Sequence, residues 1–145
     1  MVRRIVWIFS IAGAVILAGI TAMLFSSQTQ VRIPAIAALV TFAAVILSYL
    51  GGIEWGLALH EVPGTERTRA VALGVSTLPA LAAWGILWAP SPQWQVGGAI
   101  VLFLAVWAAD LWLARHGLIP SWFVDLRTAI TAAVCLILGV AFYLL

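Results

Sequence analysis

The sequence contains no lysine, a single cysteine and few charged residues of either sign. Charged residues make up 8% of the 145 positions, whereas an ordinary soluble domain carries about 25%. The seven basic residues are all arginines and are spread thinly, which argues against a nucleic-acid-binding surface. Cys135 has no second cysteine with which to form an internal disulfide, so we interpret it as a small buried hydrophobic residue.

Long apolar runs dominate the chain instead, and hydrophobic residues account for 65% of it. A soluble protein of this size has too much surface for its volume to bury so many apolar side chains. A helix of about 20 apolar residues crosses a bilayer core, and the runs lack the alternation of membrane barrel strands. We therefore predict an all-α integral membrane protein. It is expected to be a single transmembrane domain over residues 1–145, a bundle of five helices at approximately 5–25, 33–59, 69–89, 95–114 and 122–145.

The arginines orient this bundle, because cytoplasmic segments of membrane proteins carry an excess of basic residues. With the N-terminus inside, the outer segments hold only Arg32. The inner segments hold the other six, which are Arg3, Arg4, Arg67, Arg69, Arg115 and Arg127. We predict a cytoplasmic N-terminus and a C-terminus on the outer side.

Small residues and one proline predict how the helices pack. Gly52 and Gly56 are four residues apart on one helix face, and Gly51 adjoins them. We assign these glycines to close packing within the chain, with a homodimer contact as the alternative. Pro79 lies in the middle of the third run, where it predicts a kink.

Tryptophan is abundant, with eight residues in the chain. Trp122 stands at a predicted membrane interface, the zone that tryptophan prefers. Trp55, Trp84 and Trp112 are placed deeper or less clearly. For these three we expect core packing, with stacking against a ligand as the alternative.

The ionisable residues gather at the predicted cytoplasmic ends of the helices. Glu54 and Asp110 lie about 9 Å and about 6 Å inside their helices, counted at 1.5 Å per residue. Isolated carboxylates at such depths are costly, and Arg127, about one turn into the fifth helix, is the natural partner. We predict a network of Glu54, Asp110 and Arg127. It either holds the helices together or forms a ligand or proton site.

Motifs for other chemistry are missing from the sequence. A zinc site usually needs three or four ligands, and His60 and His116 are the only histidines. His60 and Glu61 are adjacent, so on a helix their side chains point to different sides. Phosphate-binding glycine loops and nucleophile elbows do not occur. We expect no metal and no cofactor, and we do not favour an enzyme.

Three segments resemble the family called domain of unknown function 3429, which includes the mitochondrial transmembrane protein 69. They are LGGIEWGLAL at 50–59, LPALAAW at 78–84, and a stretch from 110 to 131 that includes GLIPSWF and LRTAIT. The resemblance implies a protein of the bacterial inner membrane with mitochondrial relatives, but no mechanism. Five residues of interest fall in these segments, namely Glu54, Trp55, Asp110, Trp122 and Arg127. The position of Glu54 can carry other polar residues in that family, which favours a polar site over a catalytic acid.

Three classes of function fit these features. In the first, a pocket near the cytoplasmic face binds an apolar small molecule with a polar head, such as a lipid, quinone or porphyrin. Glu54, Asp110 and Arg127 would meet the head, and tryptophans would line the rest. In the second, the protein is an accessory or assembly subunit of a larger, respiratory-type membrane complex. In the third, it transports protons or a small solute.

The predicted network leads to a double-mutant test. Glu54→Gln and Arg127→Gln should destabilise the protein non-additively, since residues of one network share interaction energy of about 0.5–3 kcal/mol. Unfolding of the detergent-solubilised single and double variants measures this coupling. Additive effects would show that the two residues act independently.

Overall fold

The computed structural model describes residues 2–60 and 66–145, and these ranges form six helices and no strand. The helices are α1 Val2–Met23, α2 Thr29–Leu59, α3 Glu66–Val75, α4 Leu78–Ile86, α5 Pro92–Arg115 and α6 Ser121–Leu144. α3 and α4 together make one span, Glu66–Ile86, so the described residues contain five segments long and apolar enough to cross a membrane. The predicted all-α, five-span protein is confirmed.

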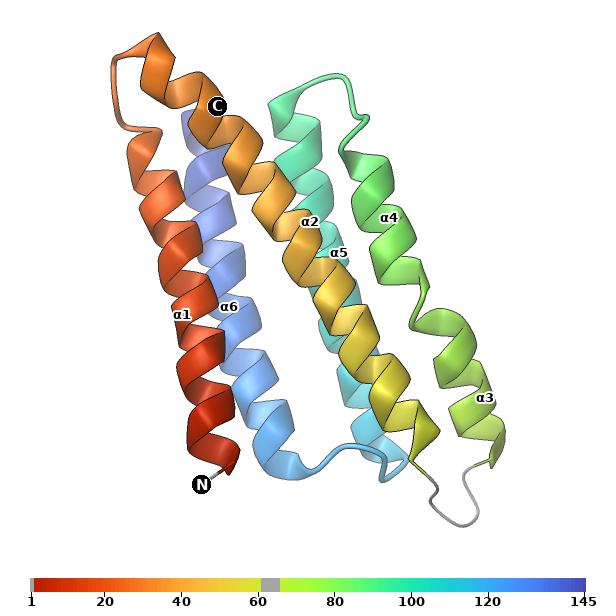
Figure 1. Ribbon diagram of the computed structural model, residues 1–145. Helices are drawn as coiled ribbons and strands as arrows, with labels where there is room; N and C mark the ends of the chain where they lie inside the picture. The colour runs from red at the N-terminus through yellow and green to blue at the C-terminus, as the bar shows by residue number, and fades with distance from the viewer. Residues whose placement is uncertain (1, 61–65) are drawn as a thin grey trace.

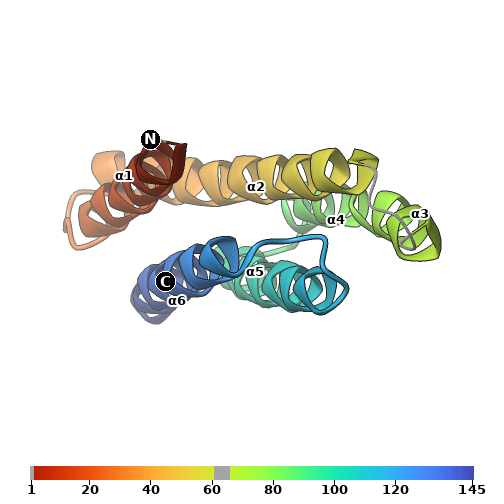
Figure 2. The ribbon, with the colours of Figure 1, turned by 90° about the horizontal axis from the view of Figure 1, so that it is seen from below.

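The helices form two layers, and α2 is the element that connects them. Figure 2 shows the α5–α6 hairpin in one layer and α1, α2, α3 and α4 in the other. α2 contacts four of the other helices, α1, α3, α4 and α5, because it crosses the bundle obliquely (Figure 1). α1 and α2 lie close where the chain passes between them and diverge toward the N-terminus. The two chain ends lie at opposite ends of the bundle, as an odd number of spans requires.

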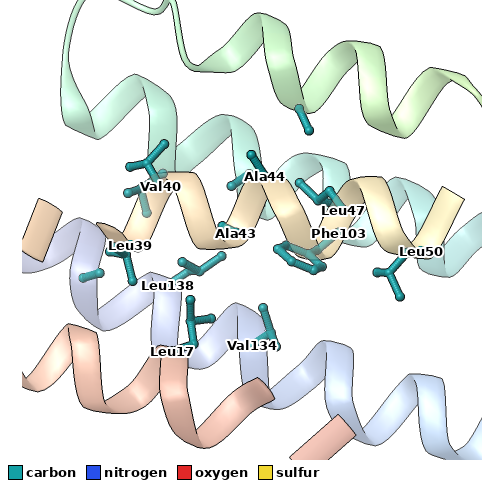
Figure 3. Packing of buried hydrophobic residues seen from close by; sticks show 14 of the residues in the cluster. Leu17, Leu39, Val40, Ala43, Ala44, Leu47, Leu50, Phe103, Val134 and Leu138 are labelled. Carbon is teal, nitrogen blue, oxygen red and sulfur yellow. The ribbon is translucent and has the colours of Figure 1, made fainter. Parts of the chain in front are cut away.

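The core lies where α2 crosses α5 and α6 (Figure 3). Its fully buried members include Leu17, Leu39, Ala43, Leu47, Phe103 and Leu138. Lipid tails are as apolar as these side chains, so close packing, rather than escape from water, must hold the helices together. Ala43 and Ala44 suit this task because their small side chains let neighbouring helices approach α2 closely.

The third span is interrupted at Ser76 and Thr77, between α3 and α4. Pro79 explains the break, because its ring clashes with the carbonyl of the residue four positions earlier, Val75, where α3 ends. The predicted kink is therefore a full break that begins before the proline. The hydroxyl groups of Ser76 and Thr77 donate to the carbonyl oxygens of Leu73 and Gly74, at 2.9 and 3.0 Å. They supply hydrogen bonds at the end of α3, which bilayer depth requires.

Gly51 lets α2 contact this break. A Cβ atom on Gly51 would stand 2.5 Å from the carbonyl oxygen of Ser76 and 3.5 Å from the Cβ of Pro79. Gly52 and Gly56 differ, since no described atom of another element lies within 4 Å of where their Cβ atoms would stand. Successive residues are rotated by about 100° around a helix, so Gly51 faces α4 while Gly52 faces outward. The close contact expected of the Gly52–Gly56 pair is thus made by Gly51 within this chain.

Two arginines close helix ends. Arg69 donates to the carbonyl oxygens of Ala58 and Leu59, at 2.9 and 3.1 Å, and so caps the C-terminus of α2. Arg32 donates to the carbonyl oxygen of Leu144 at the end of α6. A cation at a helix C-terminus meets both unpaired carbonyls and the negative end of the helix dipole.

The Gly51 contact predicts a strong contrast between neighbouring glycines. Gly51→Ala should destabilise the protein by about 1–3 kcal/mol, because the new methyl group overlaps a backbone carbonyl that is fixed by the helix break. Gly52→Ala is the matched control and should be neutral or slightly stabilising, since alanine favours helix. Thermal unfolding in detergent measures both, and equal effects would contradict the contact.

Candidate functional site

Asp110 of α5 and Arg127 of α6 form a buried ion pair. The Nε atom of Arg127 donates to Oδ2 of Asp110 at 2.6 Å, and the two side chains are 7% and 3% exposed. A short charge-assisted hydrogen bond of this kind is among the stronger polar contacts in proteins. The pair joins two members of the network expected from the sequence and bridges the α5–α6 hairpin.

Glu54 of α2 lies beside this pair but is not hydrogen-bonded to it. Its side chain is buried, and its Oε1 atom has no hydrogen-bond partner among the described residues. It lies close enough to Asp110 and Arg127 for both charges to act on it. The three-membered network is therefore an ion pair with a third carboxyl group nearby. Separate helices carry the three groups, and only the α5 and α6 side chains come within hydrogen-bond distance.

Two buried donors on α6 remain without partners. Nη2 of Arg127 and the hydroxyl of Thr131 find no hydrogen-bond acceptor in the part of the chain that the structure describes. The residues are four apart, so they lie on the same face of the helix. An unpaired buried donor costs about 1–3 kcal/mol, more for a charged group. Unpaired buried donors of this kind are expected at a site that binds a hydrogen-bond acceptor.

Arg127 and Thr131 both line a cavity that measures about 370 Å³. Its walls come from α1, α2 and α6, with Phe103 of α5, and are otherwise mainly apolar. The α1 wall includes Phe9 and Gly13, and the α2 wall includes Tyr49 and Ile53. These segments lie where α1 and α2 diverge, at the end of the bundle that holds the N-terminus (Figure 1). The volume falls within the range of small-molecule sites.

Sequence reasoning missed two parts of this cavity. It placed a pocket near this face but did not include α1, which carries no charged residue near its centre. It also passed over Thr131, although this residue lies four positions after Arg127 and within the LRTAIT stretch. The spacing from Arg127 was the available signal.

Glu54 and Trp112 belong to a different cleft. This cleft measures about 210 Å³ and lies between α2, α3 and α5, with Ala72, Val75 and Leu113 among its other walls. The predicted site residues are thus divided. Arg127 faces the larger cavity, Glu54 faces the smaller cleft, and Asp110 is buried beside both residues.

Trp55 and Trp84 lie at the surface of the bundle and not in its core, where they were expected, and Trp122 is half-buried. Trp55 and Trp84 are 43% and 62% exposed and line neither the cavity nor the cleft. Trp84 packs edge-on against Trp88. The guanidinium of Arg3 lies 5.2 Å from the centre of the Trp122 ring, a cation–π contact near the N-terminus. Such surface positions suit contact with lipid.

Metal-ligand geometry is not found within residues 2–60 and 66–145, where no three His, Cys, Asp or Glu side chains group together. His60 is exposed, and Glu61 lies outside the described residues. A ring nitrogen of His116 lies 2.8 Å from the carbonyl oxygen of Trp112.

Comparison with known proteins assigns the family. The model of the family "protein of unknown function (DUF3429)" matches residues 2–143. The chain belongs to this family. Transmembrane protein 69 of Xenopus tropicalis is 34% identical over 113 residues, which are 77% of this chain and 44% of that relative. The chain therefore spans less than half the length of this relative, and no solved structure matches. The resemblance expected from the sequence motifs is confirmed.

The buried pair predicts a characteristic mutational pattern. Arg127→Met should cost about 3–5 kcal/mol, because it leaves the Asp110 carboxylate buried and unpaired. The double variant Asp110→Leu/Arg127→Met should recover most of this loss, since apolar residues can replace a buried pair at little cost. Unfolding in detergent measures both.

The control for this pattern is Asp125→Asn, which alters an exposed carboxylate near the start of α6. It should change stability by no more than about 0.5 kcal/mol. A double variant as unstable as Arg127→Met would argue against a simple ion pair.

Proposed function

We propose that this membrane protein binds an apolar small molecule with a polar head, such as a lipid, a quinone or a porphyrin-like compound, in the cavity between α1, α2 and α6. The supporting observation is that Arg127 and Thr131, which line a mainly apolar cavity, each carry a buried donor without a partner among the described residues, Nη2 and Oγ1. Ligand sites typically combine apolar walls with a few polar groups that orient the molecule. The arrangement therefore suits an amphiphilic ligand, because it combines an apolar cavity with polar groups that can bind the head of the molecule.

The geometry favours this function over transport. A transport path requires polar groups that continue through the membrane. The cavity walls are instead mainly apolar, and their polar side chains are those of Ser10, Tyr49, Arg127 and Thr131. The Asp110–Arg127 pair keeps Arg127 in place, because its Nε atom is bonded to α5, while Nη2 has no partner among the described residues. A positioned donor loses less freedom on binding than a mobile one.

The proposal includes the place of the protein in the cell. The arginine distribution supports a cytoplasmic N-terminus. The family resemblance is the ground for placing the protein in a bacterial inner membrane. The cavity walls come from the first half of α1, the second half of α2 and the first half of α6. In this orientation the ligand site lies in the cytoplasmic half of the membrane.

A substitution that fills the cavity tests the proposal. Gly13 lines the cavity and has no described neighbour within 4 Å of its would-be Cβ, so Gly13→Leu should occupy ligand space without a clash. Native mass spectrometry of the gently purified protein should detect a bound small molecule. Its occupancy should fall at least about tenfold in Gly13→Leu, as a loss of about 1.4 kcal/mol in binding would give.

The matched control is Gly19→Leu, on the same helix. Gly19 also has no described neighbour within 4 Å, but it is exposed and lies outside the cavity. This variant should keep the bound molecule. Equal occupancy in the native protein and Gly13→Leu, or no bound molecule in either, would refute the cavity as the site.

A further inference from the structure

We infer that the cavity selects molecules whose head is an uncharged hydrogen-bond acceptor, such as the carbonyl of an ester or a quinone, over molecules with a carboxylate or phosphate head. This inference rests on the proposed function, because it concerns the ligand of the same cavity. It follows from two properties of the buried polar end of the cavity, which is formed by Arg127 and Thr131 with Asp110 beside them. These properties are the kind of hydrogen bond that its unpartnered groups can make and its net charge.

The free hydrogen-bonding groups at this end require an acceptor. The guanidinium of Arg127 has donors and no acceptor, and its buried Nη2 atom has no partner among the described residues. The Thr131 hydroxyl on the same helix face can donate as well. A carbonyl oxygen has two lone pairs and can receive both hydrogen bonds. An ammonium head would instead face a cation with only donors to offer.

The charge at this end excludes any net attraction for an anion. Asp110 lies 2.6 Å from Arg127, so the two charges sum to zero. Glu54, the next ionisable group, adds no charge when protonated and a negative charge when ionised. The buried end is therefore neutral or negative in every protonation state of Glu54. An anionic head would lose its hydration on entering the site. It would find there no cation whose charge is not already neutralised by a carboxylate.

Other charged groups near the cavity do not alter this balance. Arg3 and Arg4 precede the lining residues Ile5 and Val6 on α1, but both are exposed and neither lines the cavity. Arg3 is engaged over the Trp122 ring. Asp125 is exposed at the start of α6. Exposed charges are screened by solvent and ions, so they act weakly on a buried head group.

The test compares probes of matched tail length and different heads. Methyl dodecanoate carries a neutral ester, and dodecanoate differs from it by one methyl group and one charge. A benzoquinone with a decyl tail is the second neutral probe. Binding to the delipidated 145-residue chain in detergent is measured as the rise in its thermal stability with probe concentration. A pH of about 9 keeps the carboxylate ionised, while arginine remains protonated.

For the native protein we expect at least one neutral probe to bind about tenfold or more tightly than dodecanoate. The better of the two neutral probes indicates whether the natural head is a lipid ester or a quinone. Asp110→Asn removes one negative charge from beside Arg127, so an anionic head meets less repulsion there. The ratio of neutral-probe to dodecanoate affinity should then fall at least about tenfold, because hydrogen bonds between ionised partners are the stronger ones. Both affinities in this ratio are measured on the same variant, so the ratio does not depend on how stable that variant is.

A second variant tests the acceptor if Asp110→Asn does not fold. Thr131→Val removes the hydroxyl and keeps the shape, so neutral probes should bind about 2- to 10-fold more weakly, as the loss of one hydrogen bond implies. Thr21→Val is the control, because the Thr21 hydroxyl of α1 is also buried and unpartnered but lies outside the cavity. It should leave probe binding unchanged.

The outcomes separate this inference from the proposed function. Dodecanoate binding as tightly as the neutral probes in the native protein overturns the preference for an uncharged head and leaves the cavity standing. Unchanged binding in Thr131→Val overturns the role of the α6 donors. Binding that Gly13→Leu does not weaken, or no binding of any probe, overturns the cavity as a ligand site and the inference with it.

Discussion

The ion pair between Asp110 and Arg127 is the interaction on which the polar part of this structure depends. A lone carboxylate or guanidinium at this depth would be costly, and each group lowers the free-energy cost of burying the other. The pair joins α6 to α5, the two helices of one hairpin. It also holds Arg127, a residue that lines the cavity and whose Nη2 atom has no partner among the described residues. The same contact thus supports the fold and prepares the candidate site.

The helices themselves follow from the sequence because membrane insertion depends on composition. Five apolar runs of sufficient length became five spans, and the cost of burying Asp110 indicated Arg127 as its partner. The motif at 50–59 indicated the family. These features depend on few residues at a time, so they can be recognised without knowing how the helices meet.

The arrangement of the helices was harder to foresee. α2 is apolar on all sides, so its pattern does not show which face turns inward, and Gly51 could not be distinguished from Gly52. Pro79 predicted a bend, but the position of the break depends on the carbonyl four residues earlier. The cavity arises because α1 diverges from α2, and that angle is set by packing of the whole bundle. Glu54 was grouped with Arg127 by depth alone, and depth does not specify the direction of a side chain.

The position of the cavity between membrane-spanning helices has a consequence for how its occupancy is controlled. A molecule that reaches it from the bilayer is already dissolved in lipid, so its relevant concentration is its mole fraction among the lipids of that leaflet. Transfer from water contributes nothing to selectivity, because every competitor has already made that transfer. Discrimination must come from the few polar groups among the lining residues, which belong to Ser10, Tyr49, Arg127 and Thr131. A site with weak affinity by aqueous standards could still be filled, provided that its ligand is a common component of the membrane.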